Sequence, residues 1–251
     1  MIEVKNIHKT FGDRKVINDV SFVFESGKTN LVIGESGSGK TTILKMMVGL
    51  HSPDSGSVEY DGRSFTSSTE REKQEVRKEI GMLFQGGALF DSLTVEQNVA
   101  FPLEMFTSLT KEEKTERVNF CLKKVNLEGK NKLYPAELSG GMKKRAALAR
   151  AISNNPKYLF CDEPNSGLDP RTSLVIDALI KEITTDLGMT TVVITHDMNS
   201  VMEIGQNILF LYKGNMWWQG TNKEILTTDN REILDFVYAS EFLKQLKPKK
   251  Q

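Results

Sequence analysis

Residues 34–41 constrain the fold more than any other part of the chain. They are Gly34, Glu35, Ser36, Gly37, Ser38, Gly39, Lys40 and Thr41. An apolar run at Thr29–Ile33 precedes them, and a helical pattern begins near Thr42. Glycines at this spacing let successive backbone N–H groups converge on a phosphate, and the start of a helix favours the same anion. The segment therefore predicts a phosphate-binding loop between a strand and a helix.

Two side chains of this loop suit a nucleotide with a divalent cation. Lys40 can neutralise the β and γ phosphates, and the Thr41 hydroxyl can ligate Mg²⁺. Thr42, at the expected start of the helix, is counted with the nucleotide-binding residues. A purely structural glycine turn is the alternative, and the strand and helix on either side argue against it. ATP and Mg²⁺ are the expected ligands.

A second apolar run, residues 158–161, ends in the adjacent carboxylates Asp162 and Glu163. In phosphoryl-transfer proteins this arrangement lets the first acid hold the Mg²⁺ shell while the second faces the γ phosphate. Isolated acidic pairs are often only solvated strand ends or helix caps. Together with the phosphate loop, the pair predicts a hydrolytic site.

A third motif, Ser139-Gly140-Gly141, precedes the helical run Lys143–Ile152. The amides of its serine and glycines should lie at a helix N-terminus, which is a second place where an anion can bind. Alone, the motif would be read as a helix cap.

The remaining pattern predicts an α/β fold with a mostly parallel sheet. Strand patterns at 3–7, 16–24 and 57–60 and the turn Asp61-Gly62 indicate an N-terminal antiparallel β subdomain. Capping boxes at Thr94/Gln97 and Thr110/Glu113 favour helices, so residues 88–155 are expected to form an inserted helical subdomain. The runs after Pro156 lack alternation, as strands covered on both faces do.

Charge and hydropathy exclude some functions. Lys plus Arg equals Asp plus Glu at 33 each, so the chain has no overall basic field, and no nucleic-acid partner is expected. No apolar run approaches the roughly 18–20 residues of a membrane-spanning helix. Cys121 and Cys161 fall in segments that read as buried, which suits a reducing compartment.

In this order the motifs resemble those of the ABC (ATP-binding cassette) ATPase family, over residues 1 to about 222. In that family the phosphate loop of one subunit and the LSGGQ-type signature of a second copy close on the same nucleotide. The resemblance implies a P-loop NTPase fold, ATP hydrolysis and a nucleotide-sandwich dimer. It gives Ser139, Gly140 and Gly141 the signature role and makes Glu163 the general base or water-orienting carboxylate.

The resemblance also assigns four residues that carry little signal alone. Phe11 matches the aromatic that stacks on adenine, and Gln85 the glutamine that links the Mg²⁺ to the helical subdomain. Asp169, in Ser166-Gly167-Leu168-Asp169, matches the D-loop at the subunit interface, and His196 the switch histidine that senses the γ phosphate. Asp169 before Pro170 is also the expected N-cap and first-turn pair of a helix.

Two positions depart from the family pattern. Met142 stands where the signature usually has glutamine, so nucleotide-driven dimerisation is expected to be weaker while hydrolysis survives. Asn165, after Asp162-Glu163-Pro164, occupies a variable position that the sequence does not explain.

Within the family, residues 82–90 and 139–151 look like the ATPase of Mla-type bacterial systems, which maintain outer-membrane lipid asymmetry. This resemblance implies phospholipid transport, integral membrane permease subunits and an MCE-domain lipid-binding subunit as partners. It also implies a place on the cytoplasmic face of the inner membrane. Gly86–Phe90 would form a groove for a short coupling helix of the permease, or else a loop packed on its own subdomain.

Other family members remain open as alternatives. Importer ATPases for polar amino acids or other small solutes share this motif order. Residues 223–251 are expected to be too few for the added regulatory domain of sugar-type cassettes, and to form an amphipathic helical tail packed on its own domain or on a partner. Soluble ABC-type ATPases usually have paired cassettes or long coiled coils, and a non-hydrolytic clamp would lack Glu163 or His196.

Overall fold

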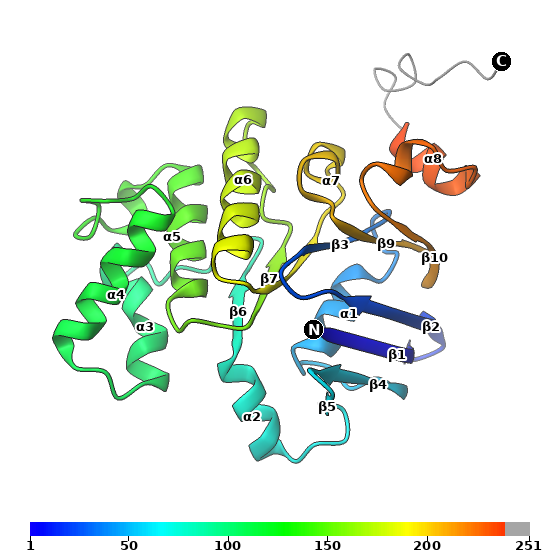
Figure 1. The fold of residues 1–251 in the computed structure, drawn as a ribbon, viewed down its shortest axis with the longest axis horizontal. Coiled ribbons are helices and arrows are strands. Elements are labelled where there is room, and N and C mark those ends of the chain that lie inside the picture. Colours follow the sequence, from blue (N-terminus) through cyan, green and yellow to red (C-terminus); the bar gives the residue numbers. More distant parts are fainter. Residues whose placement is uncertain (239–251) are drawn as a thin grey trace.

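The computed structural model describes residues 1–238, which form two β-sheets flanked by helices (Figure 1). The smaller sheet is antiparallel, in the order β2-β1-β4-β5. Its strands are β1 (Ile2–Phe11), β2 (Arg14–Phe24), β4 (Ser55–Tyr60) and β5 (Arg63–Ser64). The turn predicted at Asp61-Gly62 joins β4 to β5, with φ of 47° and 76°. Both values are positive, as the tight hairpin turn requires.

The larger sheet has the order β10-β9-β3-β8-β7-β6. Its strands are β3 (Thr29–Ile33), β6 (Ile80–Leu83), β7 (Tyr158–Asp162), β8 (Thr190–Ile194), β9 (Asn207–Tyr212) and β10 (Asn215–Gly220). All neighbours are parallel except β10, which is antiparallel to β9. The predicted fold class, a mostly parallel core with an N-terminal antiparallel sheet, is confirmed.

The helices are α1 (Lys40–Met47), α2 (Glu70–Lys78), α3 (Val95–Phe106), α4 (Lys111–Lys124), α5 (Gly140–Ile152), α6 (Pro170–Asp186), α7 (Met198–Ile204) and α8 (Arg231–Val237), with short 3₁₀ turns η1 (Pro135–Glu137) and η2 (Glu224–Leu226). Both predicted capping boxes are present, at Thr94 before α3 and Thr110 before α4. The helix after the phosphate loop begins at Lys40, slightly before the predicted start near Thr42, because the loop's last glycine already acts as its N-cap.

Both faces of the parallel sheet are covered, which explains why its strands lack alternation. Leu31 and Ile33 belong to a core shared with α3, α5 and α6. Val32 and Ile194 face the other way, into a core shared with α1 and the antiparallel sheet. Every residue of β3 and β8 is buried, and the sheet is therefore a rigid platform for the segments that leave its edge.

Two predictions concern parts at the periphery. Residues 88–155 include α3, α4 and α5, which gather at the left of Figure 1; their boundaries as a subdomain stay a prediction.

In the C-terminal segment Ile233 and Val237 are buried, and the Phe236 ring lies 5.4 Å from that of Phe210. The apolar pattern of the amphipathic tail predicted from the sequence also includes Phe242, Leu243 and Leu246, which lie outside the described residues. Within residues 1–238, no helix is long and apolar enough to cross a membrane.

Candidate active site

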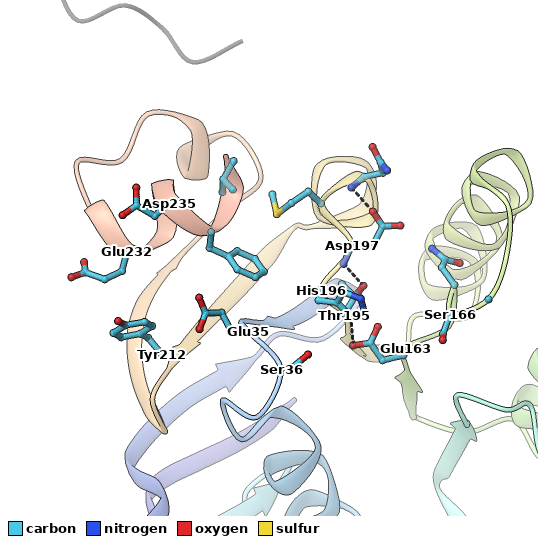
Figure 2. Close-up of a pocket in the computed structure, with 16 residues that line it drawn as sticks. Glu35, Ser36, Glu163, Ser166, Thr195, His196, Asp197, Tyr212, Glu232 and Asp235 are labelled. Atoms are coloured by element: carbon cyan, nitrogen blue, oxygen red, sulfur yellow. Dashed lines mark hydrogen bonds and ion pairs between the residues drawn. The ribbon is translucent and has the colours of Figure 1, made fainter. Parts of the chain in front are cut away.

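The register of the parallel sheet brings four predicted segments to one edge. Asp162 pairs with Ile194, which in turn pairs with Val32, and Leu83 pairs with Cys161. Because parallel strands all end on the same side, the segments after β3, β8, β7 and β6 leave the sheet side by side. They carry the phosphate loop, His196, Glu163 and Gln85. Figure 2 shows the first three around one hollow.

Two glycines of the phosphate loop are required by close packing. Gly34 and Gly39 have φ of 146° and 109°. A Cβ on Gly34 would lie 2.3 Å from the Leu211 carbonyl oxygen, and one on Gly39 would lie 2.5 Å from Ile17 Cδ1. The loop is therefore held between β9 and β2, with backbone angles that side chains rarely adopt.

The loop offers a cation and an unpaired hydroxyl to an anion. Lys40 Nζ donates to the carbonyl oxygens of Gly34 and Glu35, at 2.8 and 2.9 Å. Burial lowers the pKa of Lys40, while Glu163 and Asp162 act to raise it. The Ser38 hydroxyl is buried and has no hydrogen-bond partner within residues 1–238. Buried polar groups are normally paired, so this donor set fits a phosphate.

Glu163 and His196 form a hydrogen-bonded pair in the hollow. Nδ1 of His196 lies 2.8 Å from Oε1 of Glu163 (Figure 2). Glu163 adopts φ of 48°, a left-handed angle that costs on the order of 1–3 kcal/mol for a residue other than glycine. Its backbone N–H donates to the Ile194 carbonyl oxygen at 2.9 Å. The hydrogen bond to β8 thus holds the strained backbone of Glu163 in a conformation that directs its carboxylate toward His196.

Three lysines lie close enough to Asp162 to act on its pKa. Burial and then Glu163 raise the pKa of Asp162, and Lys45, Lys40 and Lys144 oppose the rise. Residues 1–238 contain no group of three or more His, Cys, Asp or Glu side chains that could hold a metal. Mg²⁺ does not require such a group, because it keeps waters and binds one or two protein ligands together with substrate phosphates. Thr41 is exposed at the start of α1, near this edge.

Gln85 and Lys144 link the edge to the helices. Gln85 Nε2 donates to the Ser166 hydroxyl at 3.2 Å. Lys144, in α5, is buried and donates through Nζ to the Gln85 carbonyl oxygen, with the Glu163 carbonyl oxygen at 3.5 Å. The sequence did not single out Lys144, because it lies in the run Lys143-Lys144-Arg145, which reads as a solvated basic face. Only the folded structure shows that Lys144, the middle residue of this run, is buried.

The signature motif does not line this hollow. Ser139 is the N-cap of α5 and accepts a hydrogen bond from the Met142 N–H at 3.3 Å. A Cβ on Gly141 would lie 2.5 Å from Thr172 Cγ2, so the motif packs on the start of α6. Asp169 is the N-cap of α6, as predicted, and its carboxylate accepts from the N–H groups of Arg171 and Thr172. Neither Ser139 nor Gly140 lines the hollow that Glu163 and His196 share.

Phe11 also lies outside the hollow. Its ring is 44% exposed at the end of β1 and contacts His51 edge-on, with 5.3 Å between ring centroids. An exposed ring is free to stack on a base, and the adenine role stays a prediction.

Met142, where the family signature usually has glutamine, is partly buried and packs on the core beneath α5.

A glycine-rich loop, a carboxylate pair and a histidine on one edge of a parallel sheet define a P-loop protein that hydrolyses a nucleotide. The ABC transporter family matches residues 17–166 of this chain. Methionine import ATP-binding protein MetN of Campylobacter jejuni is 38% identical over 259 residues, covering 97% of this chain and 77% of MetN. The intermembrane phospholipid transport system ATP-binding protein MlaF of Haemophilus influenzae is 38% identical over 237 residues, covering 94% of this chain and 90% of MlaF.

A solved structure supports the same assignment. The dimeric post-hydrolysis state of the ATP-binding cassette MJ0796, bound to ADP and Pi, has a TM-score of 0.79 and 32% identity, covering 88% of this chain and 99% of that one. This chain belongs to the ABC transporter family. It is an ATP-binding subunit that hydrolyses ATP with Mg²⁺.

Proposed function

We propose that the edge of the parallel sheet binds and cleaves ATP through the residues named above. Lys40 and the amides of residues 34–42 hold the phosphates, and Glu163 with His196 faces the γ phosphate. The 2.8 Å hydrogen bond between Glu163 and His196, beside the phosphate loop, carries this proposal.

The chemistry follows from what these groups can do. When bound, Mg²⁺ neutralises charge that develops on the phosphates. Thr41, Asp162 and Gln85 are its proposed ligands. Because a carboxylate only accepts hydrogen bonds, His196 donates through Nδ1, which fixes the ring and directs Nε2 away from Glu163. Glu163 can then accept from the attacking water. Rate enhancement comes mainly from positioning and charge stabilisation.

Glu163→Gln tests this assignment. The variant keeps the size of the side chain and the phosphate loop, and loses the carboxylate. We expect ATP binding to be retained and turnover to fall by about 10²- to 10⁴-fold. Nucleotide affinity and phosphate release measure the two effects, and undiminished hydrolysis would remove Glu163 from its role.

We infer that the complete site needs a second copy of the chain. Ser139, Gly140 and Gly141 form a helix start that does not line the chain's own hollow, and Asp169 lies beside it at the start of α6. The MJ0796 cassette is described as dimeric. In the proposed dimer the signature of one copy covers the γ phosphate bound by the other, and Asp169 lies at the interface.

An exposed apolar surface is the proposed dock for a short helix of a membrane permease. It consists of Phe90, Phe101, Met105 and Phe106, which are 38–61% exposed, and the rings of Phe90 and Phe101 lie 4.7 Å apart. Arg150 holds the loop beneath it by donating to the carbonyl oxygens of Gly87 and Ala88, at 2.7 and 2.6 Å. Grouped exposed apolar side chains commonly mark interaction sites. The chain would thus work on the cytoplasmic face of the membrane, with the permease as its anchor.

The proposed cargo is phospholipid, moved between bacterial membranes with an MCE-domain subunit. Its support is the resemblance of residues 82–90 and 139–151 to Mla-type ATPases, together with the 38% identity to MlaF. The second candidate is import of an amino acid or another small solute, because MetN, a methionine import ATP-binding protein, is equally identical at 38%.

Co-purification separates the two cargoes. The chain is tagged in its native host, the membranes are solubilised gently, and the bound proteins and lipids are identified. The lipid proposal expects a permease, an MCE-domain subunit and phospholipid. Recovery of a solute permease without an MCE-domain subunit would favour the importer and leave the ATPase chemistry intact.

A further inference from the structure

Asn165, which the sequence left unexplained, lies at a buried junction of three elements. Its Nδ2 donates to Asp177 Oδ1 in α6 and to the Ser200 hydroxyl in α7, both at 2.9 Å. Asn165 is 9% exposed, Asp177 1% and Ser200 fully buried. One amide group therefore joins the segment after Glu163, the helix that this segment enters, and the helix that follows His196.

This polar cluster has an energetic cost that apolar residues would avoid. Asp177 Oδ2 and Asn165 Oδ1 have no hydrogen-bond partner within residues 1–238. Burial raises the pKa of Asp177 to about 6, and Asp197 and Glu203 from α7 add to the rise while Ser200 and Asn165 oppose it. Breaking a buried polar contact is costly, but replacing a whole cluster with apolar side chains is often neutral or stabilising. Stability alone is a weak reason for this cluster.

The two segments that the cluster joins both carry proposed active-site groups. Ser166, next to Asn165, is the hydrogen-bond partner of Gln85, and the segment continues to Asp169. Asp197, next to His196, is the N-cap of α7, and Ser200 lies in that helix. A shift of one segment relative to the other must therefore break the bond between Asn165 and Ser200 or move the other segment with it.

We propose that Asn165, Asp177 and Ser200 act as positioning residues that make residues 166–169 and His196 move as one unit. The interface segment and the histidine of the same copy then reach their working positions together. This inference rests on the proposed roles of Glu163, His196 and Asp169. The cluster acts through the segments that it joins and touches neither nucleotide nor metal.

Hydrogen exchange of the full chain without nucleotide tests the link independently of catalysis. The Ser166 and Leu168 amides donate to the carbonyl oxygens of Glu163 and Asn165, and the Val201 amide to that of Asp197, so both segments have protected amides. In Asn165→Leu we expect exchange to rise by about 2- to 30-fold in residues 166–169 and 197–204 together. A rise in only one of these segments would overturn the proposal.

Two further variants separate positioning from general stability. Asp177→Asn keeps an acceptor and places an N–H donor where an unpaired oxygen lies, so both segments should stay as protected as in the wild type. Thr184→Val is the matched control, because Thr184 is buried in the same helix but bonds to Ile180 and Thr191. If this control opens both segments as much as Asn165→Leu does, the cluster is merely structural.

Kinetics provide the second readout. Asn165→Leu should lower kcat for ATP hydrolysis by about 2- to 30-fold with a smaller change in KM, and Asp177→Asn should retain kcat. If Asn165→Leu fails to fold, Ser200→Ala removes the bond that joins the two segments and should give the same pattern of changes. An equal loss in Thr184→Val would contradict the proposal, whereas activity in Glu163→Gln would instead contradict the assigned site.

Discussion

The N-termini of α1 and α5 both have sequences that favour anion binding. They differ in whether a side chain of the N-cap residue already accepts a hydrogen bond from the free backbone amides of the helix. The N-cap of α1 is Gly39, which makes no side-chain cap bond. The N-cap of α5 is Ser139, whose hydroxyl accepts from the Met142 N–H. The first helix start is open to a ligand, and the second is partly closed by its own side chain.

The residues around the two helix N-termini also make α1 the more complete anion site. The start of α1 has Lys40 at its first position, with Asp162 and Glu163 close enough to act on the pKa of that lysine. The start of α5 packs on Leu168 and Thr172 of the same chain. In Figure 1, β6 and β7 lie between the two helices. One helix start is thus a nearly complete phosphate site, and the other is a surface that needs a nucleotide from another copy.

The largest effect is expected at α1. Lys40→Met removes a buried ammonium from the phosphate loop, and we expect ATP affinity of the isolated chain to fall by about 10²- to 10³-fold. Lys143→Met is the matched control, because Lys143 is an exposed lysine at the start of α5. Calorimetric titration measures both. If both variants lost ATP affinity equally, the proposed difference between the two helix N-termini would be wrong.

The next effect is expected at α5. Ser139→Ala should leave ATP affinity of the isolated chain unchanged, because Ser139 does not line that chain's hollow. Turnover should fall by about tenfold, the loss of one charge-assisted hydrogen bond to the partner's nucleotide. Steady-state hydrolysis is measured alongside binding. A parallel loss of affinity would place Ser139 in its own chain's site.

A smaller effect is expected where the two regions connect. Lys144→Met removes the buried ammonium that joins α5 to the Gln85 carbonyl oxygen. We expect kcat to fall by about three- to tenfold and Lys144→Arg to restore most of it, since arginine keeps the charge and the donors. Single-turnover hydrolysis gives the rate. If Met and Arg were equally defective, the size of the lysine would matter more than its charge.

The last prediction concerns the pH dependence of stability, at a residue whose substitution is expected to leave turnover unchanged. The pKa of Asp177 is raised from 3.8 to about 6, so folding favours the protonated acid. Its contribution to stability is therefore lost as pH rises from about 4 to 6, and stays constant above. Asp177→Asn should be more stable than the wild type by about 3 kcal/mol at pH 7, with no gain below pH 4. Urea unfolding at both pH values checks this, and a gain that is the same at both would refute the ionisation argument.

Local sequence predicted the phosphate loop, the two acids at the end of β7 and the cap at Asp169, because each depends on neighbours in the chain. The burial of Lys144 could not be predicted in this way: it lies among basic residues, and only the approach of α5 to the Gln85 loop buries it. The role of Asn165 could not be predicted either, because its hydrogen-bond partners lie 12 and 35 residues away in the sequence, in α6 and α7. The sequence also gave no sign that Ser166 would be the hydrogen-bond partner of Gln85.

Mixing two inactive variants tests most directly whether one active site needs two copies. Glu163→Gln lacks the carboxylate, and Ser139→Arg would block the signature while leaving the phosphate loop intact. In a mixed dimer, one site combines the intact Glu163 of one copy with the intact signature of the other. The account predicts that mixing restores about a quarter of wild-type hydrolysis, because half of the dimers are mixed and each has one complete site. A mixture no more active than its separate components would contradict the two-copy site.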